Sequence, residues 1–127
     1  MSLKINKVKN ASVPEKEYVL LKATADTNSK GYAIVDRTFG ANGTISNEFK
    51  HIFFLPALAL KSGDWIRIYT GKGSPNTGTN SNNISQKVYN LYWQADSCVW
   101  NDAGGDTVSL INYSLVEKTT VPPVEKK

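Results

Sequence analysis

Short segments in which apolar and polar side chains alternate, each closed by turn residues, constrain the fold of this chain most strongly. In the clearest case, residues 65–70, Ile66 and Ile68 alternate with larger or more polar side chains. An alternation of period two places successive side chains on opposite faces of a strand. No segment shows a sustained helical period of apolar residues. The sequence therefore predicts an all-β protein.

Turn residues such as Gly, Pro, Asn and Ser divide the chain into eight or nine short segments of this kind. So many short strands with frequent turns predict an antiparallel β-sandwich. The expected strands are Leu3–Lys9, Glu17–Ala23, Gly31–Arg37, His51–Leu55, Trp65–Thr70, Val88–Gln94, Ser97–Trp100, Thr107–Asn112 and Leu115–Thr119.

Three segments carry more specific expectations. The first strand should place Leu3, Ile5 and Lys7 on one face, and Pro14 after it favours an edge position. The continuous apolar run His51–Leu55 predicts a strand that is buried on both faces. The stretch Gly71–Ser85 has hardly an apolar residue, which predicts an exposed, mobile loop.

The length of 127 residues suits one domain with one core, and 40% of the residues are hydrophobic. We expect that domain to cover residues 1–120. Residues 121–127 contain two prolines and two lysines, which is typical of a linker into the rest of a larger protein.

The formal net charge of +4 comes from scattered lysines and only two arginines, Arg37 and Arg67. Dedicated nucleic-acid binders usually cluster their basic residues, so a nucleic-acid-binding accessory domain is the weaker alternative. The sequence contains no run of about 20 apolar residues, so it predicts no transmembrane helix. Its N-terminus lacks the apolar region of a signal peptide.

The residues that could carry catalysis or bind a metal are few. His51 and Cys98 are the only histidine and the only cysteine, too few for a zinc site of His and Cys ligands. His51 is better explained as a satisfied core or edge histidine, and Cys98 as a small buried hydrophobe. Asp102 and Asp106 flank two glycines, but a tight turn explains them better than a calcium site. We therefore expect no catalytic activity, metal or cofactor.

A series of short motifs covers most of the chain. They are residues 17–22 (EYVLLK), 31–34 (GYAI), 54–56 (FLP), 60–69 (LKSGDWIRIY), 91–93 (LYW), Trp100, 105–106 (GD) and 110–112 (LIN). In the order and spacing of these motifs, about residues 3–120 resemble the lamin tail domain. No coiled-coil rod accompanies the motifs, so the chain is more similar to bacterial members of that family.

This resemblance implies an immunoglobulin-like sandwich. It also implies a non-catalytic module that tethers a larger protein to a protein or cell-surface component, in an extracytoplasmic or cell-surface location. The side chains expected to face inward are Val19, Leu21, Tyr32, Ile34, Phe54, Ile66, Ile68, Leu91, Trp93, Trp100, Val108 and Leu110.

If Ile66 and Ile68 face the core, alternation turns Trp65, Arg67 and Tyr69 to the outer face of the same strand. Alternation in a later strand turns Tyr92 outward as well. Trp, Tyr and Arg are common interface hot spots, so these four residues are the candidate binding site. The alternative is that the row is covered by other segments, or that Arg67 only lies over a neighbouring ring.

Overall fold

A computed structural model describes residues 2–39, 45–100 and 107–125. For residues 37–39 and 45–50 it describes the backbone only. Its strands form a five-stranded sheet in the order β1-β2-β7-β9-β8 and a three-stranded sheet in the order β10-β4-β5. A two-stranded pair, β3-β6, and one short 3-10 helix complete the fold. Their bounds are β1 Leu3–Lys9, η1 Pro14–Lys16, β2 Tyr18–Ala23, β3 Thr27–Asn28, β4 Tyr32–Phe39, β5 Ile45–Phe54, β6 Ala59–Leu60, β7 Trp65–Tyr69, β8 Asn76–Asn80, β9 Asn83–Tyr92 and β10 Thr107–Asn112.

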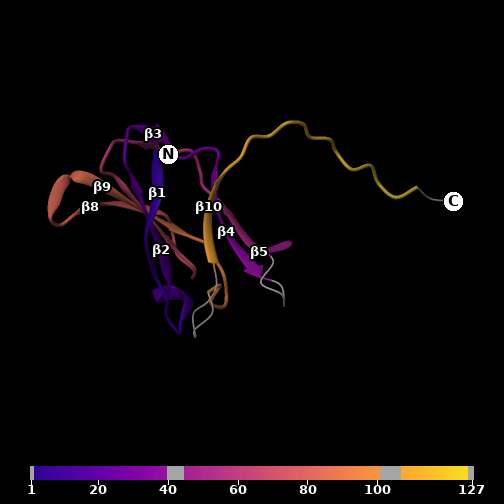
Figure 1. The fold of residues 1–127 in the computed structure, drawn as a ribbon, viewed down its shortest axis with the longest axis horizontal. Helices are drawn as coiled ribbons and strands as arrows, with labels where there is room; N and C mark the ends of the chain where they lie inside the picture. Colours follow the sequence, from indigo (N-terminus) through magenta and orange to yellow (C-terminus); the bar gives the residue numbers. More distant parts are fainter. Residues whose placement is uncertain (1, 40–44, 101–106, 126–127) are drawn as a thin grey trace.

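The prediction of an all-β sandwich is confirmed. The two larger sheets lie side by side in Figure 1, and the core cluster draws its residues from both. Trp93, Val108 and Leu110 are partly buried and pack against that cluster. The expected inward residues that are fully part of it are Val19, Leu21, Tyr32, Ile34, Ile66, Ile68, Leu91 and Trp100.

One strand pair departs from the antiparallel arrangement that the sequence predicts. β7 pairs with β2 antiparallel but with β9 parallel, with Trp65 opposite Val88 and Tyr69 opposite Tyr92. A parallel pair needs a crossover connection, and here the segment between the two strands contains β8. β8 returns along β9 at the edge of the sheet.

The prediction of a loop over Gly71–Ser85 is wrong for most of its length. Asn76–Asn80 form β8, and β9 already begins at Asn83, so the two strands form a hairpin around Ser81 and Asn82. The segment is mostly exposed, as predicted, and the residues of β8 are polar or glycine on both faces. A strand of this kind carries no apolar alternation, which is why the sequence pattern missed it.

Two predicted strands are not strands. Over Ser97–Trp100, the amides of Val99 and Trp100 donate to the carboxylate of Glu17, so they form no strand ladder there. Leu115–Thr119 lies in an extended, exposed segment that runs away from the body of the protein (Figure 1).

The faces of two outer strands also differ from expectation. β5 is not buried on both faces, because Ile52 is 38% and Phe54 58% exposed, while Phe53 packs against the core. Phe54 was therefore wrongly assigned to the interior. In β1 the register shifts between Ile5 and Lys7, so Lys7 pairs with Leu20 rather than sharing the inward face of Ile5.

Within the ranges given above, the structure contains no helix with the length and apolar character that a membrane crossing requires.

Phe53 and Phe54 provide a matched pair for testing this assignment of faces. Because Phe53 packs against Trp93 at a ring distance of 5.5 Å, Phe53→Ala should lower the free energy of unfolding by about 2–4 kcal/mol. Phe54→Ala removes a largely exposed ring and should cost less than about 1 kcal/mol. Urea unfolding followed by tryptophan fluorescence measures both. Equal losses would contradict the placement of β5.

Candidate binding surface on the five-stranded sheet

The outer face of the five-stranded sheet follows from the alternation along β2 and β7. Val19, Leu21, Ile66 and Ile68 are buried, so the residues between them face away from the core. The strand register extends the outer face to the neighbouring strands. Its positions are Lys4, Lys7 and Lys9 on β1; Tyr18, Leu20 and Lys22 on β2; Trp65, Arg67 and Tyr69 on β7; Val88, Asn90 and Tyr92 on β9; and Asn76 and Gly78 on β8.

Three tyrosines and Arg67 pack together at one end of this face. Tyr69 stacks on Tyr92 at a ring distance of 5.2 Å and 14°, and Tyr18 meets Tyr69 edge-on at 5.6 Å. The Arg67 guanidinium lies 5.1 Å from the Tyr18 ring centroid, and its Nη1 donates to the Tyr69 hydroxyl at 3.4 Å. These contacts fix the direction of the Arg67 side chain.

Trp65 lies at the other end of β7 and is held from two sides. The ammonium of Lys22 lies 4.9 Å from its ring centroid, and its Nε1 donates to Oε1 of Gln86 at 3.1 Å. The same Gln86 oxygen accepts from Nδ2 of Asn80 at 2.9 Å. The indole is therefore tied to the β8–β9 hairpin.

A cleft of about 420 Å³ opens between these two ends. A Cβ built on Gly78 would meet no atom within 4 Å, so the absent side chain of this glycine contributes open space. A volume of this size is in the range of small-molecule sites, about 300–1,000 Å³. We call it the outer-face cleft; its lining residues are Leu20, Trp65, Arg67, Gly78, Thr79, Asn80, Ser81, Val88 and Asn90.

Two buried polar atoms among the cleft residues have no hydrogen-bond partner in the described part of the chain. They are Nε of Arg67, a donor, and Oδ1 of Asn90, an acceptor. The two residues are direct partners in the register of β7 and β9. Nδ2 of Asn90 donates to Oδ1 of Asn76 at 2.9 Å. Other buried atoms of the described residues are unpaired in the same way, namely Oε2 of Glu17, Oδ1 of Asp36 and Nε1 of Trp100, so this feature does not by itself mark a ligand site.

Charge on the outer face has one sign. Lys4, Lys7 and Lys22 lie on the β1 and β2 side of the cleft, and Arg67 lies within it. None of the outer-face positions named above is Asp or Glu. Among the described residues, no carboxylate forms an ion pair with Arg67.

The structure brings the four sequence-predicted site residues together on one face. Trp65, Arg67, Tyr69 and Tyr92 are all half-buried, largely by one another and by their neighbours on the face. Their role in binding stays a prediction. Sequence reasoning missed Asn90 and Gly78, because the parallel pairing of β7 with β9 and the strand β8 leave no apolar pattern.

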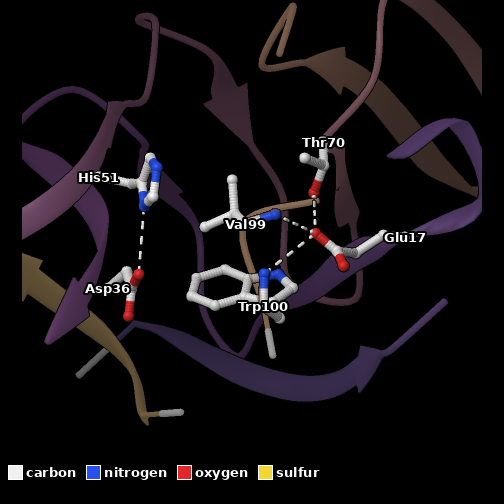
Figure 2. A network of polar contacts seen from close by, with 6 residues as sticks. All are labelled: Glu17, Asp36, His51, Thr70, Val99 and Trp100. Atoms are coloured by element: carbon white, nitrogen blue, oxygen red, sulfur yellow. Dashed lines mark hydrogen bonds and ion pairs between the residues drawn. The ribbon is translucent and has the colours of Figure 1, made fainter. Parts of the chain in front are cut away.

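The other residues considered for chemistry lie elsewhere. His51 is an edge residue whose Nδ1 lies 3.1 Å from Oδ2 of the buried Asp36 (Figure 2). Cys98 is half-buried, with Sγ 3.2 Å from the carbonyl oxygen of Ala11. Asp102 and Asp106, the weighed calcium ligands, lie outside the described residues. Within residues 2–39, 45–100 and 107–125, no three His, Cys, Asp or Glu side chains group as metal ligands would.

A second exposed surface lies on the far side of the three-stranded sheet. Phe54 is 58% and Tyr113 is 38% exposed, and their rings meet edge-on at 5.2 Å. Ile52, in the same strand as Phe54, adds to this apolar surface.

A buried carboxylate supports the tyrosine end of the candidate surface. Glu17 is fully buried, and its Oε1 accepts from the Thr70 hydroxyl at 2.7 Å and from the Val99 and Trp100 amides at 2.9 and 3.3 Å (Figure 2). Glu17 immediately precedes Tyr18, and Thr70 immediately follows Tyr69. The network therefore fixes the positions from which these two rings project.

Comparisons of the chain with family models, with curated proteins and with solved structures found no match.

Substitution of Glu17 tests this support. Glu17→Ala leaves two amides and one hydroxyl without their acceptor and should lower the free energy of unfolding by about 3 kcal/mol. Glu17→Gln keeps an acceptor oxygen in place, so its loss should be nearer about 1 kcal/mol. Chemical denaturation of both variants gives the comparison. If the alanine variant proves no less stable than the glutamine variant, the network does not stabilise the fold.

Proposed function

We propose that the protein is a non-catalytic binding module that tethers a larger protein to a protein or cell-surface component through the outer-face cleft. The observation that carries this proposal is the outer-face cleft of about 420 Å³, which Trp65 and Arg67 line.

Two of the residues that line the cleft support a binding role. Trp65 and Arg67 belong to the residue types most often found as hot spots in interfaces. Their contacts with Gln86 and Tyr69 hold them in place before a ligand arrives. Pre-organised side chains lose little conformational entropy on binding.

The resemblance to the lamin tail domain supports the tethering role. Bacterial members of the family resemble accessory domains that occur beside catalytic modules in larger proteins. Like a sandwich domain of that kind, this chain consists almost entirely of strands and their connections. His51 has Asp36 as its partner at the rim of the other sheet, away from the outer-face cleft. We therefore propose binding rather than catalysis.

A nucleic-acid-binding accessory domain is the second candidate. Lys4, Lys7 and Lys9 of β1 share the outer face with Lys22 and Arg67, which makes that face basic. A phosphate-binding surface would lose affinity steeply between low and moderate salt, whereas recognition through the cleft would change much less.

Filling the cleft tests the proposed function without knowledge of the natural partner. Small aromatic and polar fragments should shift the backbone-amide NMR signals of β7, β8 and β9 around the cleft. Gly78→Ile places a side chain in open space within a strand, so it should abolish these shifts without lowering the melting temperature. Trp65→Ala should weaken the same fragments by about tenfold, with a small change in stability.

Thr77→Ile is the matched control, since Thr77 is exposed and neighbours Gly78 in β8 but does not line the cleft. Fragment binding to this variant should equal that of the unchanged protein. Shifts that gather instead around Ile52 and Phe54 would place the binding surface on the other sheet and refute the proposal.

A further inference from the structure

We infer that the protein forms a two-fold symmetric dimer through the exposed face of its three-stranded sheet, and that residues 114–121 of each copy lie across this face of the other copy. The partner is thus a second copy of this chain. The inference goes beyond the proposed function, because the outer-face cleft lies on the other sheet. Three observations carry it: the apolar character of the face, the exposed apolar segment that follows it, and the distribution of charge.

The three-stranded sheet is apolar on both of its faces. Ile34 of β4, Phe53 of β5 and Leu110 of β10 belong to the core or pack against it, so alternation turns the residues between them to the opposite face. We call that side the far face. Antiparallel sheets with one face in water usually carry polar residues there, so an apolar far face indicates that a further layer covers it. Its described positions are Ala33 and Val35 on β4, Ile52 and Phe54 on β5, Ser109 and Ile111 on β10, and Tyr113 after β10.

The exposed part of the far face forms one patch. The register places Ala33 between Phe54 and Ile111, so these three residues share one row across the sheet. Ala33 is completely buried, whereas Phe54 is 58% exposed. Phe54 also meets the ring of Tyr113 edge-on, and Ile52 extends the patch along β5. Contiguous apolar patches on a protein surface are typical of interaction sites.

The segment that follows the patch supplies the occupant. The amide of Tyr113 donates to the carbonyl of Gly31, and every residue from 114 to 125 is exposed. Within this segment Leu115 is 72% and Val116 is 94% exposed. Figure 1 shows it, from gold to yellow, running away from the body on the side of the three-stranded sheet, so it does not cover its own far face.

The segment is long enough to cover the far face of another copy. An extended chain rises about 3.3 Å per residue and neighbouring strands lie about 4.8 Å apart, so residues 114–121 can cross all three strands. Each copy carries both an uncovered face and an uncovered apolar segment. The exchange is therefore reciprocal and closes as a two-fold dimer.

Charge selects the far face over the other sheet for contact between copies. The formal net charge of +4 makes two copies repel each other. Contact through the outer face of the five-stranded sheet would bring Lys4, Lys7 and Lys22 against the same lysines of the other copy. On the far face, none of the described side chains is charged. Homodimer interfaces are more apolar than other interfaces and poor in charge at their centre, so this face suits a second copy.

Analytical ultracentrifugation of the full chain between about 1 µM and about 0.5 mM tests the dimer. The patch is small for an obligate interface, so we expect a Kd of about 10–100 µM. Phe54→Ser should raise this Kd about tenfold or more. At about 1 µM the chain is then monomeric, so the unfolding of Phe54→Ala at that concentration measures the monomer.

Two further variants separate the segment from the face. A double variant, Leu115→Ser with Val116→Ser, changes only exposed side chains and should also raise the Kd about tenfold while leaving the melting temperature at about 1 µM unchanged. Ile84→Ser is the matched control. Ile84 is 80% exposed but lies on β9 of the other sheet, so its loss should leave the Kd unchanged.

A photo-cross-link locates the segment. p-Benzoylphenylalanine introduced in place of Leu115 should react with the peptide that contains Ile52 and Phe54. Irradiation of an equal mixture of nitrogen-15-labelled and unlabelled chains should give cross-linked peptides of mixed isotope, because the two peptides come from different copies. Cross-links of a single isotope only would show that the segment covers its own far face and would overturn the inference.

Other outcomes also overturn it. They are a chain that stays monomeric at about 0.5 mM, a dimer that Phe54→Ser or the double variant leaves unchanged, and a dimer that Ile84→Ser weakens equally. A monomer that floats with phosphatidylcholine vesicles would assign the far face to a lipid surface instead. None of these results bears on the outer-face cleft, where fragment binding is followed on β7, β8 and β9.

Discussion

The alternation of side chains along β7 is the constraint on which the rest of the structure depends. Hydrogen bonding to β2 on one side and β9 on the other makes β7 the centre of the five-stranded sheet. Its inward residues, Ile66 and Ile68, are almost completely buried in the core. Because the period of a strand is two, burying them turns Trp65 and Arg67 to the opposite face. The same register thus sets both the core and the candidate binding surface.

Polar contacts fix the ends of this arrangement where apolar packing is absent. The carboxylate of Glu17 joins the start of β2 to the end of β7 and gives partners to the amides of Val99 and Trp100. At the opposite end, Gln86 receives hydrogen bonds from Trp65 and Asn80 and so ties the hairpin to β7. The chain has a single cysteine and can form no internal disulfide. These hydrogen-bond networks therefore help to specify how the strands pack without a cross-link.

Sequence patterns predicted the elements whose apolar residues alternate and missed those fixed by polar contacts. The strand around Ile66 and Ile68, its outward row and most of the core followed from period-two patterns alone. β8 was missed because its Asn, Thr and Gly residues are polar on both faces. The sequence also could not show that Arg67 lies opposite Asn90, because this position depends on which strand pairs with β7. Phe54 was misassigned because two adjacent phenylalanines do not themselves indicate which one faces inward.

An alanine scan across β7 with the free energy of unfolding as readout tests the division between a folding face and a binding face. The account predicts losses of about 2–5 kcal/mol for Ile66→Ala and Ile68→Ala, and of no more than about 1–2 kcal/mol for Trp65→Ala and Arg67→Ala, which lose only half-buried contacts of the outer face. Losses at Trp65 and Arg67 as large as those at the isoleucines would contradict it. They would show that the outer face holds the fold together, and that the cleft between its residues is not a surface kept free for a ligand.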